Sequence, residues 1–177
     1  GHRIDEVEFH PSYHHLMGVA KDVGAHSIAW TAESGGHVAH TAMEYLLTQV
    51  EAGICCPITM TYACIPSMMQ NEFLKKEWVP KILQPEYDQR FIPAEQKSSL
   101  MIGMAMTEKQ GGSDIRSNET KAIKIQGDEY QLTGHKWFCS APMLDAFLTL
   151  AQTEKGLTCF FVPRFLPDGS KNRFFIQ

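Results

Sequence analysis

The sequence lacks an apolar run long enough to cross a bilayer, because charged or strongly polar residues interrupt every hydrophobic stretch. It also lacks a basic excess, since 16 Lys and Arg stand against 20 Asp and Glu, for a net charge of -4. Nucleic-acid binding by this chain therefore has no electrostatic support. With 177 residues and 44% hydrophobic side chains, the composition predicts a globular protein with one good core, or one domain plus part of another.

Cysteine is sparse and irregularly spaced. Five cysteines form an odd set without framework spacing, which argues against a disulfide-stapled secreted domain and predicts reduced thiols. Cys55 and Cys56 are adjacent rather than spaced as Cys-x-x-Cys, so we expect small buried side chains instead of a redox or zinc site. His37 and His40 have a spacing that suggests a metal site, but no cysteine or acidic cluster accompanies them. No metal is therefore predicted.

Residues up to about 95 have helical periodicity, without internal repeats or low-complexity tracts. Four helices are predicted: one started by Pro11 and Ser12, one with the apolar stripe Val38, Ala42, Tyr45, Leu46 and Val50, an apolar one over residues 57–69 that Pro66 kinks or ends, and a shorter amphipathic one containing Phe73, Trp78, Ile82 and Leu83.

Beyond residue 100 the apolar period becomes strand-like. Strands are predicted over residues 100–106, 121–125, 130–133, 136–140, 146–152 and 157–162, with a further strand beginning at Arg173. Gly127 and Asp128 stand at the centre of a predicted hairpin, because glycine tolerates a positive φ there. Residues 154–156 form a second predicted hairpin turn.

The most informative stretch is Met104-Ala-Met-Thr-Glu-Lys-Gln-Gly-Gly-Ser-Asp114, a polar turn at the end of an apolar strand. Gly111 and Gly112 lack the Cβ atoms that would keep a large ligand away from the backbone. Thr107, Ser113 and Asp114 add hydroxyls and a carboxylate beside backbone N–H groups. This combination suits a cofactor with phosphates and a flat polar ring, although the run alone is also typical of an ordinary turn.

A second motif, Gly134-His-Lys-Trp-Phe-Cys-Ser140, follows after about thirty residues. Together the two motifs resemble the flavin-binding signature of the acyl-CoA dehydrogenase family, which reads Thr-Glu…Gly-Ser-Asp and then Gly-x-Lys-x-Trp-Ile-Thr. Further segments resemble its AidB-type branch, namely Val7-Glu-Phe-His-Pro11, Pro57-Ile-Thr-Met-Thr61 and Cys159-Phe-Phe-Val-Pro-Arg-Phe-Leu-Pro-Asp-Gly169. The resemblance covers essentially the whole chain.

The resemblance implies an α+β fold. Residues 1–99 would form part of the family's N-terminal helical domain, as an α-helical bundle. Residues 100–177 would form part of the middle β domain, expected to be an antiparallel β-barrel or sandwich. The chain would end before the family's C-terminal helical domain, so the parent protein would be longer.

The resemblance also implies the chemistry of an oxidoreductase that acts on CH–CH bonds. The parent would bind FAD and a fatty acyl-CoA, and would oxidise the thioester by moving hydride from its β-carbon to flavin N5 while a glutamate takes the α-proton. That base would lie in the missing C-terminal domain, so this chain contributes no catalytic residue and should be inactive alone. Glu108 is expected to be a loop carboxylate bonded to local backbone N–H groups instead.

Cofactor-binding residues are carried over from the resembled motifs. Backbone amides and the Thr107 hydroxyl would meet the flavin ring, Ser113 would reach the pyrophosphate, and Ser140 would hydrogen-bond beside the isoalloxazine. The full predicted set is Met104, Ala105, Met106, Thr107, Ser113, Phe138, Cys139 and Ser140. Phe138 replaces the family's tryptophan and lacks its indole N–H, and at least one of Trp137 and Phe138 is expected to pack in the β-domain core.

Other functions stay open. The resemblance to AidB-type proteins also implies a non-catalytic alternative, either DNA binding linked to the alkylation response or the sequestration of acyl-CoA instead of its oxidation in fatty acid metabolism. The family resemblance further implies a homotetrameric parent, in the cytoplasm or the mitochondrial matrix, since no targeting segment is visible. A stand-alone helical interaction module would leave the flavin motif unexplained.

Overall fold

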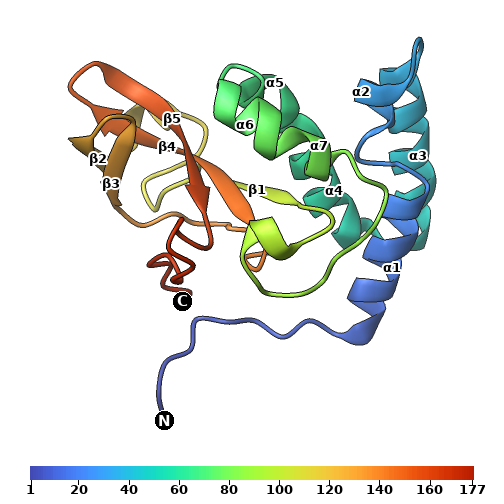
Figure 1. Cartoon of the computed structure of the whole chain (residues 1–177), viewed down its shortest axis with the longest axis horizontal. Helices are drawn as coiled ribbons and strands as arrows, with labels where there is room; N and C mark the ends of the chain where they lie inside the picture. The colour runs from blue at the N-terminus through green and yellow to red at the C-terminus, as the bar shows by residue number, and fades with distance from the viewer.

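The computed structural model describes residues 1–177, with helices in the first half and a five-stranded sheet in the second (Figure 1). The helices are α1 (Pro11–Asp22), α2 (Ile28–Thr31), α3 (Gly36–Val50), α4 (Cys55–Ala63), α5 (Ile65–Met68), α6 (Glu72–Glu77) and α7 (Val79–Ile82). The strands are β1 (Ile102–Ala105), β2 (Lys121–Gln126), β3 (Glu129–Thr133), β4 (Ala146–Thr153) and β5 (Gly156–Pro163). The predicted α+β class is therefore confirmed.

Proline and capping residues set the helix boundaries. Pro11 opens α1, and the His10 ring accepts a hydrogen bond from the Ser12 N–H at 3.1 Å. The predicted helix over residues 57–69 is divided into α4 and α5 just before Pro66, which has no N–H to donate. The predicted helix around Trp78 is likewise divided into α6 and α7, with Pro80 in the first turn of α7.

The sheet is mixed and open, which corrects the expectation of an antiparallel barrel or sandwich. Its central strand is β4, whose neighbours are β5 in antiparallel and β1 in parallel orientation. β2 joins β4 through the single parallel pair Lys121 and Gln152, and β2 forms the predicted hairpin with β3. The parallel pairs arise because long connections, rather than tight turns, bring β1 and β2 to the same edge of β4.

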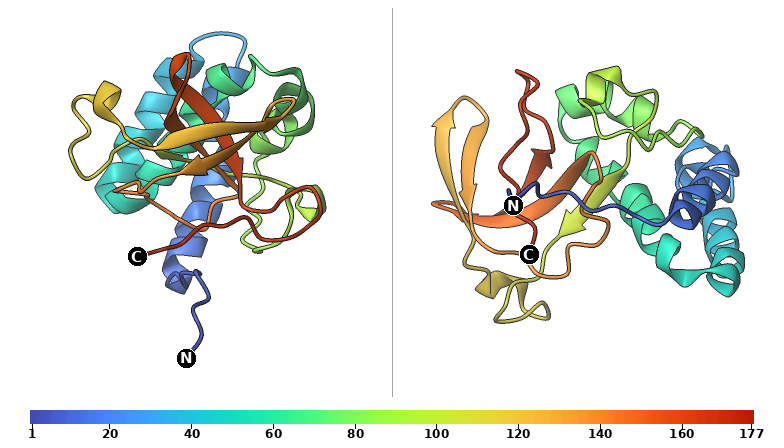
Figure 2. Two further views of the ribbon diagram at one scale, coloured as in Figure 1. Left: turned by 90° about the vertical axis from the view of Figure 1, so that its left-hand side faces the viewer. Right: turned by 90° about the horizontal axis from the view of Figure 1, so that it is seen from below.

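Both faces of the β1–β4 pair are buried by helices. On one face Ile102, Ala146 and Leu148 belong to a core with α5, α6 and α7. On the other, Met101, Ala105 and Phe147 pack with residues of α1 and α4. Side chains that alternate along a strand reach opposite faces, so these short strands read as continuous apolar runs. The right-hand view of Figure 2 shows the helices gathered on one side of the molecule and the β2–β3 hairpin on the other.

Two predicted features differ from the structure. The apolar stripe of α3 faces away from the core, since Val38, Tyr45, Leu46 and Val50 are each more than 60% exposed. The strand expected from Arg173 does not form, because the chain end bonds to the N-terminal segment instead: the Arg3 guanidinium donates to the Ile176 carbonyl at 2.8 Å, and the Ile176 N–H donates to Asp5 at 2.7 Å. The N-terminal segment is therefore in contact with the C-terminal residues.

Candidate functional site

The first predicted motif forms a loop that leaves the end of β1. The Glu108 N–H donates to the Gly111 carbonyl at 3.4 Å, and the Gly111 N–H donates back to Glu108 at 3.0 Å, which closes a tight turn. Just before that turn, the Thr107 carbonyl accepts a hydrogen bond from the Trp137 N–H at 2.9 Å. The two sequence motifs, separated by about thirty residues, are thus adjacent in space.

Glycine is favoured at the two positions of this loop for different structural reasons. Gly111 has a φ of 145°, in a region that favours glycine, and nothing lies within 4 Å of the place where a Cβ would stand. At Gly112 a Cβ would lie 2.6 Å from the Thr107 hydroxyl oxygen. Gly112 is therefore required by packing inside the loop, whereas the sequence interpretation assigned both glycines to the approach of a ligand.

The loop presents a row of hydrogen-bond donors. The N–H groups of Gly112, Ser113 and Asp114 make no hydrogen bond within the chain, and neither do the hydroxyls of Thr107 and Ser113. Consecutive N–H groups that point out of a turn form a concave binding place for anions. The donor set therefore suits a phosphate or pyrophosphate group.

The second motif forms a turn rather than the predicted strand over residues 136–140. Only Lys136 makes a bridge, to Glu108, and the chain then reverses at Phe138, where φ is 56°. A bulky residue in this left-handed conformation costs about 1–3 kcal/mol and needs support from its surroundings. The expectation of a core aromatic here was wrong, because Trp137 is 41% and Phe138 79% exposed.

The other predicted cofactor residues divide by burial. Met104 and Met106 are half-buried beside the core formed with α5–α7. The Ala105 side chain is buried in the opposite core, so only its backbone can face a ligand. Cys139 is half-buried, and burial raises the pKa of its thiol, while Ser140 is exposed and donates its N–H to the Phe138 carbonyl at 3.0 Å. No hydrogen bond joins Ser113 to this segment.

Glu108 is the most heavily bonded side chain in the site. Its carboxylate accepts hydrogen bonds from Lys136 at 2.6 Å, from the Glu119 N–H at 2.6 Å, and from both the N–H and the hydroxyl of Thr120. Burial raises the pKa of Glu108, but these donors outweigh it and bring the pKa to about 2. The expected role as a bonded loop carboxylate is confirmed, whereas Lys136 and Thr120 were missed as its partners.

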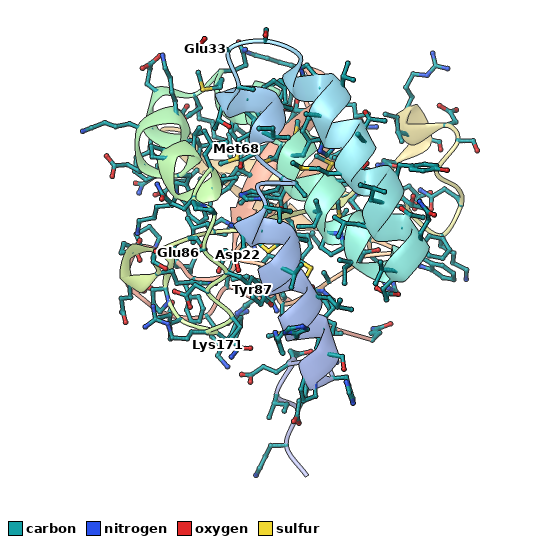
Figure 3. All side chains as sticks on the ribbon, turned by 90° about the vertical axis from the view of Figure 1, so that its right-hand side faces the viewer. Asp22, Glu33, Met68, Glu86, Tyr87 and Lys171 are labelled. Carbon is teal, nitrogen blue, oxygen red and sulfur yellow. The ribbon has the colours of Figure 1, made fainter.

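A surface groove lies elsewhere on the molecule. It has a volume of about 490 Å³ and is lined mainly by polar residues after α7 together with Asp22 at the end of α1. Figure 3 shows Asp22, Glu86 and Tyr87 close together on this face. None of the predicted cofactor residues lines the groove, and its Asp88 carboxylate is already paired with Arg90 at 2.6 Å.

The structure holds no group of three or more His, Cys, Asp or Glu side chains arranged to bind a metal ion. The two histidines of the His37–His40 spacing bond to different elements: the His40 ring contacts the Ala25 carbonyl at 2.6 Å, and the His37 ring contacts the Tyr62 hydroxyl at 2.9 Å. No helix has both the length and the apolar character that crossing a membrane requires.

Comparison with known proteins adds two family matches. Residues 1–89 match the profile of the adaptive response protein AidB N-terminal domain, and residues 103–173 match that of the acyl-CoA dehydrogenase middle domain. Together these matches include both motifs of the loop site.

Individual relatives are similar over nearly the whole chain. The AidB protein of Escherichia coli is 50% identical over 97% of this chain, which covers 32% of the relative. Acyl-CoA dehydrogenase family member 11 of Caenorhabditis elegans is 30% identical over 86% of the chain and 25% of the relative. A crystal structure of C. elegans ACDH-11 in complex with C11-CoA superposes with a TM-score of 0.80 at 25% identity, over 97% of this chain and 31% of that one. The chain thus spans a quarter to a third of the length of these relatives.

Proposed function

Since the chain belongs to the acyl-CoA dehydrogenase family, in its AidB-type branch, we propose that it is part of an FAD-dependent protein that oxidises fatty acyl-CoA thioesters. The observation that carries this proposal is the juxtaposition of the two motif segments. Exposed aromatic side chains stand on one segment, free backbone N–H groups on the other, and the Trp137–Thr107 hydrogen bond holds the two together.

The residues present fit FAD. Its pyrophosphate needs donors, which the N–H groups of residues 112–114 and the Ser113 hydroxyl supply. Its ring needs apolar surface and donors to its polar edge, which Phe138, Met104 and Met106, with the Thr107 hydroxyl, supply. Cys139 and Ser140 would lie beside the ring, and Ala105 would contribute only its backbone. Bound FAD would supply the hydride acceptor for α,β-oxidation.

We further propose that this chain contains no catalytic base and does not turn over acyl-CoA alone. Glu108 directly follows Thr107 of the proposed flavin residues, but hydrogen bonds occupy its carboxylate and hold its pKa at about 2. A carboxylate with so low a pKa is a poor proton acceptor. The base would come from a part of the protein outside these residues.

We also propose the substrate class from membership of the acyl-CoA dehydrogenase family. The C. elegans relative has been crystallised with C11-CoA, which supports an acyl-CoA of a fatty acid as the ligand of the full-length protein. That protein is proposed to be a homotetramer of the cytoplasm or the mitochondrial matrix. An alternative within this branch is a flavoprotein that sequesters acyl-CoA or protects DNA from alkylation without oxidising a substrate. Bleaching of bound flavin by acyl-CoA in the full-length protein would distinguish dehydrogenation from both.

Titration of this chain with FAD, followed by the change in flavin fluorescence, tests the cofactor site. Saturable binding is expected, and Thr107→Ala or Ser113→Ala should each weaken it about tenfold, because a hydrogen bond to a charged or strongly polar group contributes roughly 1.5 kcal/mol. Thr41→Ala on the exposed face of α3 removes a hydroxyl far from the loop and should leave the affinity unchanged. A titration without saturable binding would contradict a flavin site in this chain.

A further inference from the structure

Glu108 connects three separate parts of the loop region. Gln110 on the turn itself donates to its carboxylate at 2.9 Å, and the backbone of Glu119 and Thr120 donates from the returning end of the loop. Lys136 donates at 2.6 Å from the segment that leads to Trp137. The Glu108 side chain is only 4% exposed and that of Lys136 11%, so water competes little for these bonds.

Backbone pairing next to the ion pair reinforces it. Lys136 and Glu108 also form a backbone bridge, and the next N–H, that of Trp137, donates to Thr107. Lys136 therefore holds the aromatic segment against the loop at the residue immediately before its two exposed aromatic side chains. The strained turn at Phe138 begins only two residues beyond Lys136. Where the Phe138 ring lies thus depends on where Lys136 is held.

We infer that Glu108 and Lys136 are positioning residues of the flavin site, whose ion pair fixes the spacing between the donor loop of residues 107–114 and the aromatic segment of residues 137–140. This inference rests on the proposed function, since it assigns the spacing to one cofactor held by both segments. Neither side chain is required to touch the cofactor. Their effect is to keep the pyrophosphate donors and the aromatic surface at a fixed separation.

A second ion pair supplies a matched control. Lys97 and Asp145 lie 2.6 Å apart with side chains 6% and 9% exposed, and Asp145 also accepts the Met101 N–H at 2.8 Å. Removing either lysine charge leaves a buried carboxylate beside a backbone donor. If Lys136 only stabilises the fold, Lys136→Met and Lys97→Met should change FAD affinity alike, even though their losses of stability differ.

The test compares these two variants, and Lys136→Arg, in two measurements on the whole chain. Amide hydrogen exchange without FAD should show at least tenfold faster exchange at the Trp137 N–H in Lys136→Met than in Lys97→Met, and faster exchange at the Met101 N–H only in Lys97→Met. FAD affinity should fall about tenfold in Lys136→Met, remain unchanged in Lys97→Met, and be largely restored in Lys136→Arg. If Lys136→Met does not fold, the double variant Glu108→Gln/Lys136→Met removes both charges and is measured instead.

Equal changes in the two lysine variants, in exchange at Trp137 and in FAD affinity, would overturn the inference and leave the pair a stabilising contact only. If the wild-type chain binds no FAD, the proposed function fails for this chain. The exchange measurement made without FAD then still decides whether Lys136 couples the two segments, so the two failures are distinguishable.

Discussion

Lys97 and Asp145 lie as close together as Lys136 and Glu108, at 2.6 Å, but the two carboxylates differ in the number of donors around them. Asp145 accepts hydrogen bonds from Lys97 and from the Met101 N–H. Glu108 accepts five, from side chains and backbone of three segments. Burial raises the pKa of Asp145 in spite of its lysine, whereas the pKa of Glu108 falls to about 2. At the same ion-pair length, the donors around Glu108 outweigh burial, whereas burial outweighs the two donors of Asp145.

The surroundings of the two pairs explain this difference. Asp145 stands at the start of β4, where helices and sheet meet, and its other near cation is the fully buried Lys21. Burial lowers the pKa of Lys21 to about 8, and its amino group reaches only the Leu100 carbonyl, at 3.5 Å. Apolar side chains dominate this junction between the two cores, so Lys21 and Asp145 find few hydrogen-bond partners there. The loop around Glu108 has little apolar packing and is organised by hydrogen bonds.

The largest expected effect is a difference in stability between Lys97→Met and Lys136→Met. Lys97→Met leaves Asp145 buried with a single remaining donor and should lower the free energy of unfolding by roughly 3–5 kcal/mol. Lys136→Met leaves Glu108 with four donors and should cost only about 1–3 kcal/mol. Urea unfolding measures both, with Lys124→Met on the exposed face of β2 as the control that should change little. A larger loss of stability in Lys136→Met than in Lys97→Met would show that the number of donors left to the carboxylate does not set the cost.

The next largest effect is on the pH dependence of stability, which Glu108 and Asp145 should change in opposite directions. Glu108 has a folded pKa of about 2 against an ordinary value of 4.5, so its stabilisation, about 3 kcal/mol, is complete above pH 4.5 and is lost as the pH falls toward 2. Asp145 has a raised folded pKa, so its ionisation weakens the fold, and stability recovers as the pH falls through that pKa toward 3.8.

Chemical unfolding of wild type, Glu108→Gln and Asp145→Asn over this pH range measures both signs. As the pH falls, the difference in free energy of unfolding between wild type and Glu108→Gln should shrink. Over the same range the free energy of unfolding of wild type should rise relative to that of Asp145→Asn. Parallel profiles of stability against pH for the two variants would contradict the opposite pKa shifts of Glu108 and Asp145.

Local signals predicted much of this fold. The start of α1 at Pro11, the break before Pro66 and the hairpin centred on Gly127 depend on residues next to each other in sequence, and all three are present. The position of the loop of residues 107–114 at the end of an apolar strand was also predicted, because the change from an apolar to a glycine-containing sequence is local. The bonded carboxylate of Glu108 was expected from the family resemblance.

Features that depend on distant partners were not predicted. Lys136 pairs with Glu108 across 28 residues, and β1 pairs with β4 across more than 40, and no spacing rule identifies such partners. The outward stripe of α3 was missed for a related reason: periodicity shows that a helix has an apolar side but not what that side meets. At residues 136–140 a β-favouring composition was overridden by the positive φ of Phe138.

The smallest expected effect is a change in stability at Phe138, two residues beyond the Glu108–Lys136 ion pair, where φ is positive. Phe138→Gly relieves the left-handed conformation and removes a ring that is 79% exposed, so it should raise the free energy of unfolding by about 1 kcal/mol. Phe73→Gly removes a ring that is 64% exposed from α6, where φ is ordinary, and should lower stability by about 1 kcal/mol. Thermal unfolding of both variants measures the contrast, and a loss of stability in Phe138→Gly would mean that the ring contributes contacts in the free chain. A gain in stability combined with weaker FAD binding would show that the Phe138 conformation is kept for the ligand, at a cost to the fold that the Glu108–Lys136 pair offsets.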